Sequence, residues 1–191
     1  MGPTLRGIVL AGGRSSRLGG LHKPAIMIGG VAIVARAIAA LRAVGAQVLV
    51  VGDPAGVPDG VAVVREDPPY AGPLAAVAAG VAGLDPEPDG VILLLGGDMP
   101  FVTPDTLRAL AENAPAVATD EDERAQPLCA AWPEGLLRER LAALGDPTNR
   151  PLRILYAEAS PHRVSIAARE AMDVDTPDLL RAALADPGAG E

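Results

Sequence analysis

A stretch near the N-terminus combines consecutive glycines with several positive charges. Gly12 and Gly13 follow the apolar run 7–10, and the cations after them are Arg14, Arg17 and Lys23. Glycine lets the backbone reach φ > 0 and approach a ligand closely, and successive backbone N–H groups can then surround an anion. The whole chain carries a formal net charge of −8. The local positive charge therefore predicts a ligand with several negative charges, of which a nucleoside triphosphate is the simplest.

Two common phosphate-binding loops do not match this stretch. The Walker pattern G-x-x-x-x-G-K-[ST] requires Ser or Thr after its lysine, whereas Lys23 is followed by Pro24. The dinucleotide pattern G-x-G-x-x-G fails because no glycine stands two positions after Gly12 or Gly13. The alternative is a surface loop with scattered cations, and the apolar run directly before the loop favours the phosphate site.

Two carboxylates follow apolar runs further along the chain. Asp98 comes shortly after the run 91–95, and Asp67 comes shortly after the run 61–64. Magnesium commonly takes one or two carboxylates together with substrate phosphates, which makes Asp98 a candidate magnesium ligand. Asp67 could accept hydrogen bonds from ribose hydroxyls or from a guanine N–H edge. For both residues, the alternative is an ordinary loop aspartate that caps or turns the backbone.

Alternating strands and helices must position these residues. Apolar runs predict strands, and amphipathic or Ala-rich stretches predict helices; the strands are expected at 7–10, 47–51, 61–64 and 91–95, with a short apolar piece at 25–28, and the helices at 31–44 and 73–82. This order predicts an α/β fold with a mostly parallel sheet and helices on both faces. Such sheets bind ligands at the carboxyl ends of their strands, so the loops 11–23, 65–72 and 96–103 should meet at one site.

The second half of the chain has a less regular pattern. We expect helices at 104–113, 134–144, 151–157 and 177–185, and strands at 117–119, 127–132 and 162–166. Thr103 is a candidate N-cap, and the acidic run 120–123 is interpreted as a solvated turn. Residues 1–191 are expected to form a single domain with a frayed tail at 186–191.

Composition excludes several classes of function. Aromatic residues make up 2% of the chain, too few for the stacking platforms of single-stranded nucleic acid binding. The negative net charge argues against a nucleic-acid or anionic-membrane partner. The single cysteine, Cys129, lies in an apolar run and is interpreted as a buried structural thiol. With no signal peptide and no apolar run of membrane-spanning length, the protein is expected to be cytoplasmic.

The motifs together resemble one known family. Residues 10–23 are similar to the signature L-A-G-G-x-S-x-R-M-G-x-D-K of the molybdenum cofactor guanylyltransferases, with Leu18 for Met and His22 for Asp. Further family motifs follow at plausible distances: an acidic residue before G-P-L-A-G at 67–76, [C/G]-D-x-P at 97–100, Q-P-L-x-A-x-[WY] at 126–132 and N-x-N-T-P-E-D-L at 173–179. The resemblance implies a Rossmann-like three-layer α/β/α nucleotidyltransferase fold with a mixed, mostly parallel central sheet.

The resemblance also implies substrates and residue roles. GTP and molybdopterin would be the substrates, Mg²⁺ the cofactor, and proteins of molybdoenzyme maturation transient partners. The implied catalytic residues are Arg17, Lys23 and Asp98, and the implied nucleotide contacts are Leu10, Ala11, Gly12, Gly13, Lys23, Asp67 and Asp98. Asp98 would hold Mg²⁺. Asp175 is a second candidate ligand, although N-capping of the last helix through Thr176 also explains this segment.

A basic segment resembles the part of the family that receives the second substrate. Arg150 and Arg153 lie three positions apart, so they would share one face if residues 151–157 form a helix. Two guanidinium groups could then bind the terminal phosphate of a pterin bidentately. The alternative is a pair of exposed, solubilising arginines.

Departures from the family pattern keep two other functions open. His22 replaces an Asp, and Gly52-Asp53 stands where relatives carry a nucleotide-contacting Asn. One alternative is a cytidylyltransferase of the same fold, although L-A-G-G at residues 10–13 favours guanylyl transfer because cytidylyl relatives tend to carry L-A-A-G. The other alternative is a nucleotide-binding module without catalytic activity.

Overall fold

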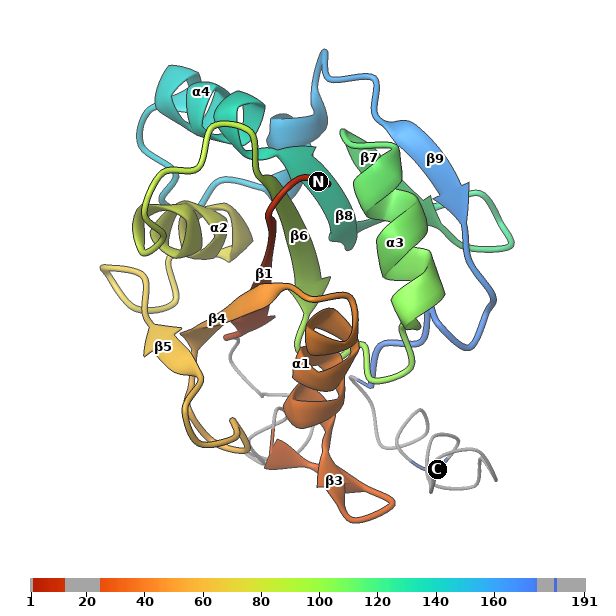
Figure 1. Cartoon of the computed structure of the whole chain (residues 1–191). Helices are drawn as coiled ribbons and strands as arrows, with labels where there is room; N and C mark the ends of the chain where they lie inside the picture. The colour runs from red at the N-terminus through yellow and green to blue at the C-terminus, as the bar shows by residue number, and fades with distance from the viewer. Residues whose placement is uncertain (1, 13–24, 175–180, 182–191) are drawn as a thin grey trace.

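A mixed seven-stranded sheet forms the centre of the protein (Figure 1). The computed structural model describes residues 2–12, 25–174 and 181. Its strands and helices follow in the order β1 (Leu5–Ala11), β2 (Met27–Ile28), β3 (Val31–Ala32), α1 (Ile33–Ala43), β4 (Gln47–Gly52), β5 (Ala62–Val64), α2 (Pro73–Ala82), β6 (Val91–Gly96), α3 (Pro104–Glu112), β7 (Ala116–Thr119), β8 (Ala125–Pro133), α4 (Glu134–Leu144), the 3₁₀-helix η3 (Leu152–Tyr156) and β9 (His162–Ser165).

The sheet has the strand order β5-β4-β1-β6-β8-β7-β9. Strands β5, β4, β1 and β6 are parallel, and β8 is antiparallel to both β6 and β7. A parallel pair formed by β7 and β9 completes the sheet. The predicted α/β class with a mostly parallel, mixed sheet is therefore confirmed.

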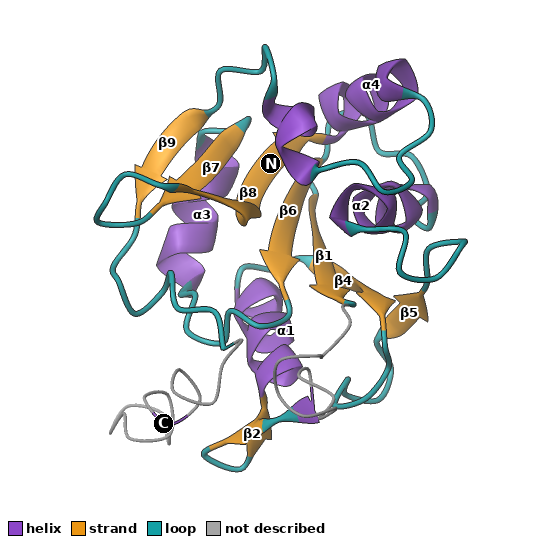
Figure 2. Ribbon diagram, turned by 180° about the vertical axis from the view of Figure 1, so that it is seen from behind, coloured by secondary structure: helices purple, strands orange, loops and turns teal. Residues whose placement is uncertain are grey.

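Helices cover the two faces of the sheet (Figures 1 and 2). Alternate strand residues point to opposite faces: Val9 and Leu93 pack with α1 and α3, whereas Ile8 and Ile92 pack with α2, α4 and η3. The two apolar clusters sandwich the sheet and give the expected three layers. No helix of the described residues is long and apolar enough to span a bilayer.

Local sequence signals account for the starts of helices α2 and α3. Helix α2 begins at Pro73, as expected for proline in a first helical turn. The Thr103 hydroxyl accepts the Thr106 N–H at the start of α3, so the predicted N-cap is confirmed. The helix predicted from residue 31 begins two residues later, because Val31 and Ala32 pair with β2 in a short antiparallel hairpin.

A buried group of charged residues lies at the amino-terminal end of β1, away from the strand carboxyl termini. The Glu134 side chain is fully buried, and its Oε1 accepts the Glu87 N–H at 2.9 Å and Arg138 Nε–H at 2.8 Å. Its Oε2 lies 3.6 Å from Nε of the buried Arg6, which also donates to the Asp85 carbonyl. This carboxylate therefore connects β1, the loop before β6, and α4.

Replacing the buried carboxylate should destabilise the fold. We expect Glu134→Gln to lower the free energy of unfolding by about 3 kcal/mol, because Arg6 would keep a buried charge without its counter-ion. The matched control is Glu139→Gln on the exposed side of the same helix, expected within about 0.5 kcal/mol of the parent. Urea unfolding monitored by circular dichroism measures both, and equal midpoints would contradict the assignment.

Candidate functional site

The carboxyl ends of three parallel strands meet at one edge of the sheet. In β1, Leu10 lies opposite both Val51 of β4 and Gly96 of β6. Two backbone hydrogen bonds continue this alignment past the strands: Gly97 donates to the Leu10 carbonyl at 2.9 Å, and Asp53 donates to the Ala11 carbonyl at 3.2 Å. The first residues of all three following loops are therefore held side by side.

Two glycines allow these loops to approach each other. Gly52 has φ = +126°, and a Cβ there would lie 2.7 Å from the Ala11 carbonyl carbon and the Gly12 nitrogen. A Cβ on Gly97 would lie 3.0 Å from the Leu10 carbonyl oxygen. Side chains at either position would push the loop after β1 away from its neighbours, so a glycine is required at the base of the site.

A cavity of about 260 Å³ lies at this edge. Its lining residues are Leu10, Gly12, Glu66, Tyr70, Gly72, Pro73, Ala76, Asp98 and Leu128. They come from the loops after β1, β5 and β6, from α2 and from β8. The structure thus brings Asp98 together with Leu10 and Gly12, three residues that the sequence placed in one site.

Glu66, and not Asp67, is the carboxylate of the 65–72 loop that lines this cavity. Glu66 is 7% exposed, and its Oε1 accepts the Tyr70 N–H at 2.9 Å. Its buried Oε2 has no hydrogen-bond partner among the described residues. Asp67 is exposed and absent from the lining. The sequence signal, a carboxylate after β5, was present for both residues, but it does not tell which of two neighbours turns inward.

The N-terminus of α2 also opens on the cavity. Gly72 precedes the helix with φ = +97°, and Pro73 occupies the first turn. The first N–H groups of a helix have no partner within it and carry a partial positive charge, which favours anions. On its outer side, the Asn149 N–H donates to the Ala71 carbonyl at 2.7 Å, so the 149–156 segment begins beside this helix start.

The loop that carries Asp98 is fixed from the C-terminal part of the chain. The Asp98 carbonyl accepts the Val174 N–H at 2.9 Å, and Val174 packs against Phe101. Glu170 accepts hydrogen bonds from Thr103 and Thr106. Burial tends to raise the pKa of Glu170, but these hydrogen bonds together lower it by more, so the pKa lies below its usual value. The ionised carboxylate therefore ties the segment before residue 175 to the start of α3.

Several predicted site residues lie outside the described residues. These are Gly13, Arg17 and Lys23 in the first loop, and Asp175 near the C-terminus. Their predicted roles remain predictions. Ala11 is described and buried at the end of β1, where its carbonyl accepts the Asp53 N–H.

The expected pairing of Arg150 and Arg153 on one helix face is wrong. The helical segment is a 3₁₀-helix that begins at Leu152, so Arg150 precedes it. The Arg150 guanidinium donates to the Leu144 carbonyl at the end of α4. Arg153 lies in η3 and lines a second cavity. Only Arg153 of the two therefore faces a cavity in the described structure.

The thiol of Cys129 is buried in β8, as the sequence suggested. Burial raises its pKa to about 12, so the thiol stays protonated at neutral pH and is unsuited to nucleophilic attack.

Among the described residues, two carboxylates, Glu66 and Asp98, line the cavity in which a metal ion could bind. No group of three or more His, Cys, Asp or Glu side chains gathers into a metal cage in the described part of the chain. Asp98 presents a hard oxygen donor at the rim of the cavity. So few carboxylates suit Mg²⁺, which commonly binds one or two of them and takes its other ligands from substrate phosphates and water.

Residues 7–164 match the family model described as the MobA-like NTP transferase domain. The chain belongs to this family. Among curated relatives, the molybdenum cofactor guanylyltransferase of Acidiphilium cryptum is 38% identical over 141 residues, 69% of this chain and 68% of that protein. The molybdenum cofactor guanylyltransferase of Nitrobacter hamburgensis is 33% identical over 153 residues, 74% of this chain and 73% of that protein.

Solved structures share the fold over nearly the whole chain. A nucleotidyl transferase from Methanothermobacter thermautotrophicus has a TM-score of 0.71 at 28% identity and covers 95% of this chain and 96% of its own. Rv0371c from Mycobacterium tuberculosis has a TM-score of 0.78 at 24% identity and covers 97% of this chain and 100% of its own. The resemblance read from the motifs, to a family of nucleotidyltransferase enzymes, is therefore confirmed.

The close approach at Gly52 can be tested by adding a single methyl group. We expect Gly52→Ala to lower the free energy of unfolding by about 3 kcal/mol, because the residue has φ > 0 and its Cβ would meet backbone atoms. The matched control is Gly60→Ala, which also has positive φ but has no atom within 4 Å of the added Cβ. Its cost should be about 1 kcal/mol. Equal losses in urea unfolding would show that the approach to Ala11 is unimportant.

Proposed function

We propose that this protein transfers GMP from GTP to the phosphate of molybdopterin and releases pyrophosphate. The observation that carries the proposal is the convergence of Gly12, Glu66 and Asp98 on one cavity at the carboxyl edge of a MobA-like fold. The curated relatives named molybdenum cofactor guanylyltransferase support the choice of nucleotide and acceptor.

The proposed reaction is a displacement at the α-phosphorus of GTP. An oxygen of the acceptor phosphate forms a bond to this phosphorus, and the bond to the β-phosphate oxygen breaks, so pyrophosphate leaves with the electron pair. The acceptor phosphate is already anionic at neutral pH, and a general base is therefore unnecessary. The work left to the protein is positioning and stabilisation of charge.

Individual residues take distinct parts of this work. The backbone at Gly12 and the start of α2 place N–H groups near the phosphates, and Arg17 and Lys23 would add positive charge there. Asp98 would hold Mg²⁺, which when bound supplies neutralisation of phosphate charge. The hydrogen bond from the Gly97 N–H to the Leu10 carbonyl keeps the Asp98 loop beside the end of β1.

Glu66 supports guanine as the base. Its buried Oε2 is an acceptor without a partner in the described structure, within a cavity whose other walls include Leu10, Ala76 and Leu128. A guanine Watson–Crick edge presents two adjacent donors, N1–H and the N2 amino group, which suit a carboxylate. Cytosine presents one amino donor beside two acceptors, which repel it. An unpaired buried acceptor costs about 1–3 kcal/mol, so a ligand that satisfies it is favoured by a similar amount.

The reaction itself is tested with purified protein, Mg²⁺, molybdopterin and each of the four nucleoside triphosphates. We expect pyrophosphate release with GTP and not with the other three nucleotides. For Asp98→Asn we expect kcat to fall by at least about 100-fold, because charge at the α-phosphate would be poorly neutralised. Asp105→Asn, on the exposed surface of α3, is the control. Release with CTP instead of GTP would establish the cytidylyltransferase alternative, and GTP binding without release would establish the binding module.

The role of Glu66 is tested by isosteric substitution. Glu66→Gln keeps an oxygen for the Tyr70 N–H but replaces the other oxygen by a donor. We expect kcat/KM for GTP to fall by roughly 10–100-fold, the equivalent of losing one charge-assisted hydrogen bond. Asp67→Asn on the next residue is the matched comparison. If Asp67→Asn loses GTP preference and Glu66→Gln does not, the sequence-based assignment of Asp67 holds and that of Glu66 fails.

A further inference from the structure

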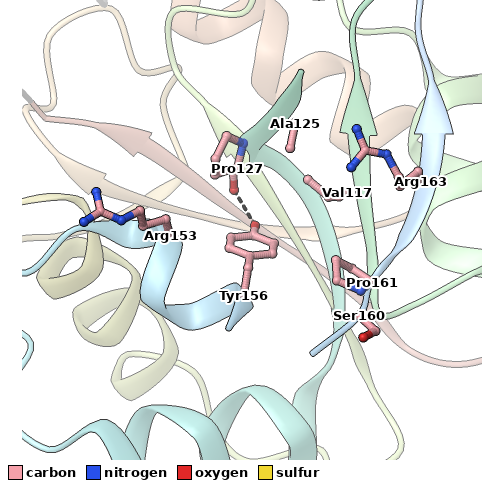
Figure 3. Close-up of a pocket in the computed structure, with 8 residues that line it drawn as sticks. All are labelled: Val117, Ala125, Pro127, Arg153, Tyr156, Ser160, Pro161 and Arg163. Carbon is pink, nitrogen blue, oxygen red and sulfur yellow. Dashed lines mark hydrogen bonds between the residues drawn. The ribbon is translucent and has the colours of Figure 1, made fainter. Parts of the chain in front are cut away.

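A second cavity is lined in part by residues of strands β7, β8 and β9 (Figure 3). Its volume is about 450 Å³, and its lining residues are Val117, Ala125, Pro127, Arg153, Tyr156, Ser160, Pro161 and Arg163. They come from β7, β8, η3, the loop after η3, and β9. None of the nucleotide contacts implied by the sequence lines it.

The centre of this cavity is a fixed aromatic ring. The Tyr156 hydroxyl donates to the Pro127 carbonyl, and its ring packs against Trp132 with centroids 5.2 Å apart (Figure 3). Burial raises the pKa of Tyr156 above its usual value, so the phenol remains a neutral donor. Because its polar end is already used, Tyr156 joins Val117 and Pro161 as an apolar wall suited to a flat ring.

Two arginines lie on opposite sides of Tyr156 (Figure 3). Arg153 makes no hydrogen bond or ion pair with any described residue, and Arg163 donates to the Glu123 carbonyl without a carboxylate partner there. The nearest acidic run is partly neutralised within itself, because Asp122 pairs with Arg124 at 2.9 Å. In a chain with a net charge of −8, two exposed guanidinium groups without acidic partners favour an anionic ligand.

One strand, β8, contributes residues to both cavities. Pro127 lines the second cavity, and the next residue of β8, Leu128, lines the first. A register shift between Val117 and Ala118 in the β7–β8 pairing coincides with this part of β8. The 149–156 segment begins with Asn149, whose N–H donates to the Ala71 carbonyl next to Gly72 of the first cavity. The same segment contributes Arg153 to the second cavity. Strand β8 and the 149–156 segment therefore contribute to the surroundings of both cavities.

We propose that this second cavity binds the ring system of the acceptor while the acceptor phosphate lies beside Asp98. The inference rests on the proposed function, since a reacting phosphate near Asp98 leaves the rest of the acceptor to be placed. The ligand class is a flat heterocycle with further anionic substituents, which stacks on Tyr156 and pairs with Arg153 and Arg163. Arg163 is a specificity-determining residue that the sequence motifs did not indicate.

Two independent variants test the cavity. Arg153→Ala/Arg163→Ala removes its charge, and Ala125→Phe fills part of its volume at an exposed position at the start of β8. We expect each to raise KM for molybdopterin by about tenfold or more, with KM for GTP and kcat at saturating acceptor changed less than about twofold. Arg108→Ala, an exposed arginine of α3 on the other face of the sheet, is the control for the loss of a surface arginine.

Direct binding separates failure of the cavity from failure of the reaction. Equilibrium binding of molybdopterin, without nucleotide, is measured for the parent and both variants. Unchanged molybdopterin binding and KM in both variants would overturn the cavity assignment and leave guanylyl transfer intact. Loss of GTP affinity in the double variant would also overturn it, because the arginines would then serve the nucleotide. If the parent binds molybdopterin through these arginines but transfers no GMP, the cavity stands and the proposed reaction falls.

Discussion

The alignment of three strand ends is the constraint on which the site depends. Residues of β1, β4 and β6 stay in register up to Ala11, Gly52 and Gly96, and two backbone hydrogen bonds carry the alignment into the loops. Such closeness is available only where one side chain is absent, because any Cβ at Gly52 would occupy the space of the Ala11–Gly12 peptide. The chemistry at this edge therefore begins with a steric condition on the backbone. Charge and hydrogen bonding act on a geometry that the glycines permit.

The antiparallel strand β8 extends the site beyond the parallel half of the sheet. Because β8 runs opposite to β6, its first residues lie beside the carboxyl end of β6 and reach both cavities. The parallel strands supply Gly12, Glu66 and Asp98, while β8, η3 and β9 supply the walls further out. The two halves of the chain thus contribute different parts of the surface that a two-substrate reaction would need.

The fold and the meeting of Gly12 with Asp98 at one cavity could be predicted because their signals are local. Apolar runs, Pro73 and Thr103 mark strands and helix starts within a few residues, and the rule for strand ends then brings Gly12 and Asp98 together. Three features could not be read in this way. Val31 and Ala32 join a hairpin through their partners in β2, and Arg150 turns to the end of α4 instead of sharing a helix with Arg153. Arg163 reaches its cavity through pairing with β7, where it lies opposite Val117. Each depends on a contact with another secondary-structure element, which a local sequence pattern does not reveal.

Oε2 of Glu66, which has no partner among the residues that the structure describes, has a consequence for the free protein. A buried acceptor without a donor costs free energy in the folded state, and the unfolded chain does not bear this cost because water reaches the carboxylate. Any ligand that brings an N–H group to this atom therefore stabilises the native state as well as binding to it. Recognition of the base and resistance to unfolding would meet at one atom, so that the protein is at its most stable only when the cavity is filled.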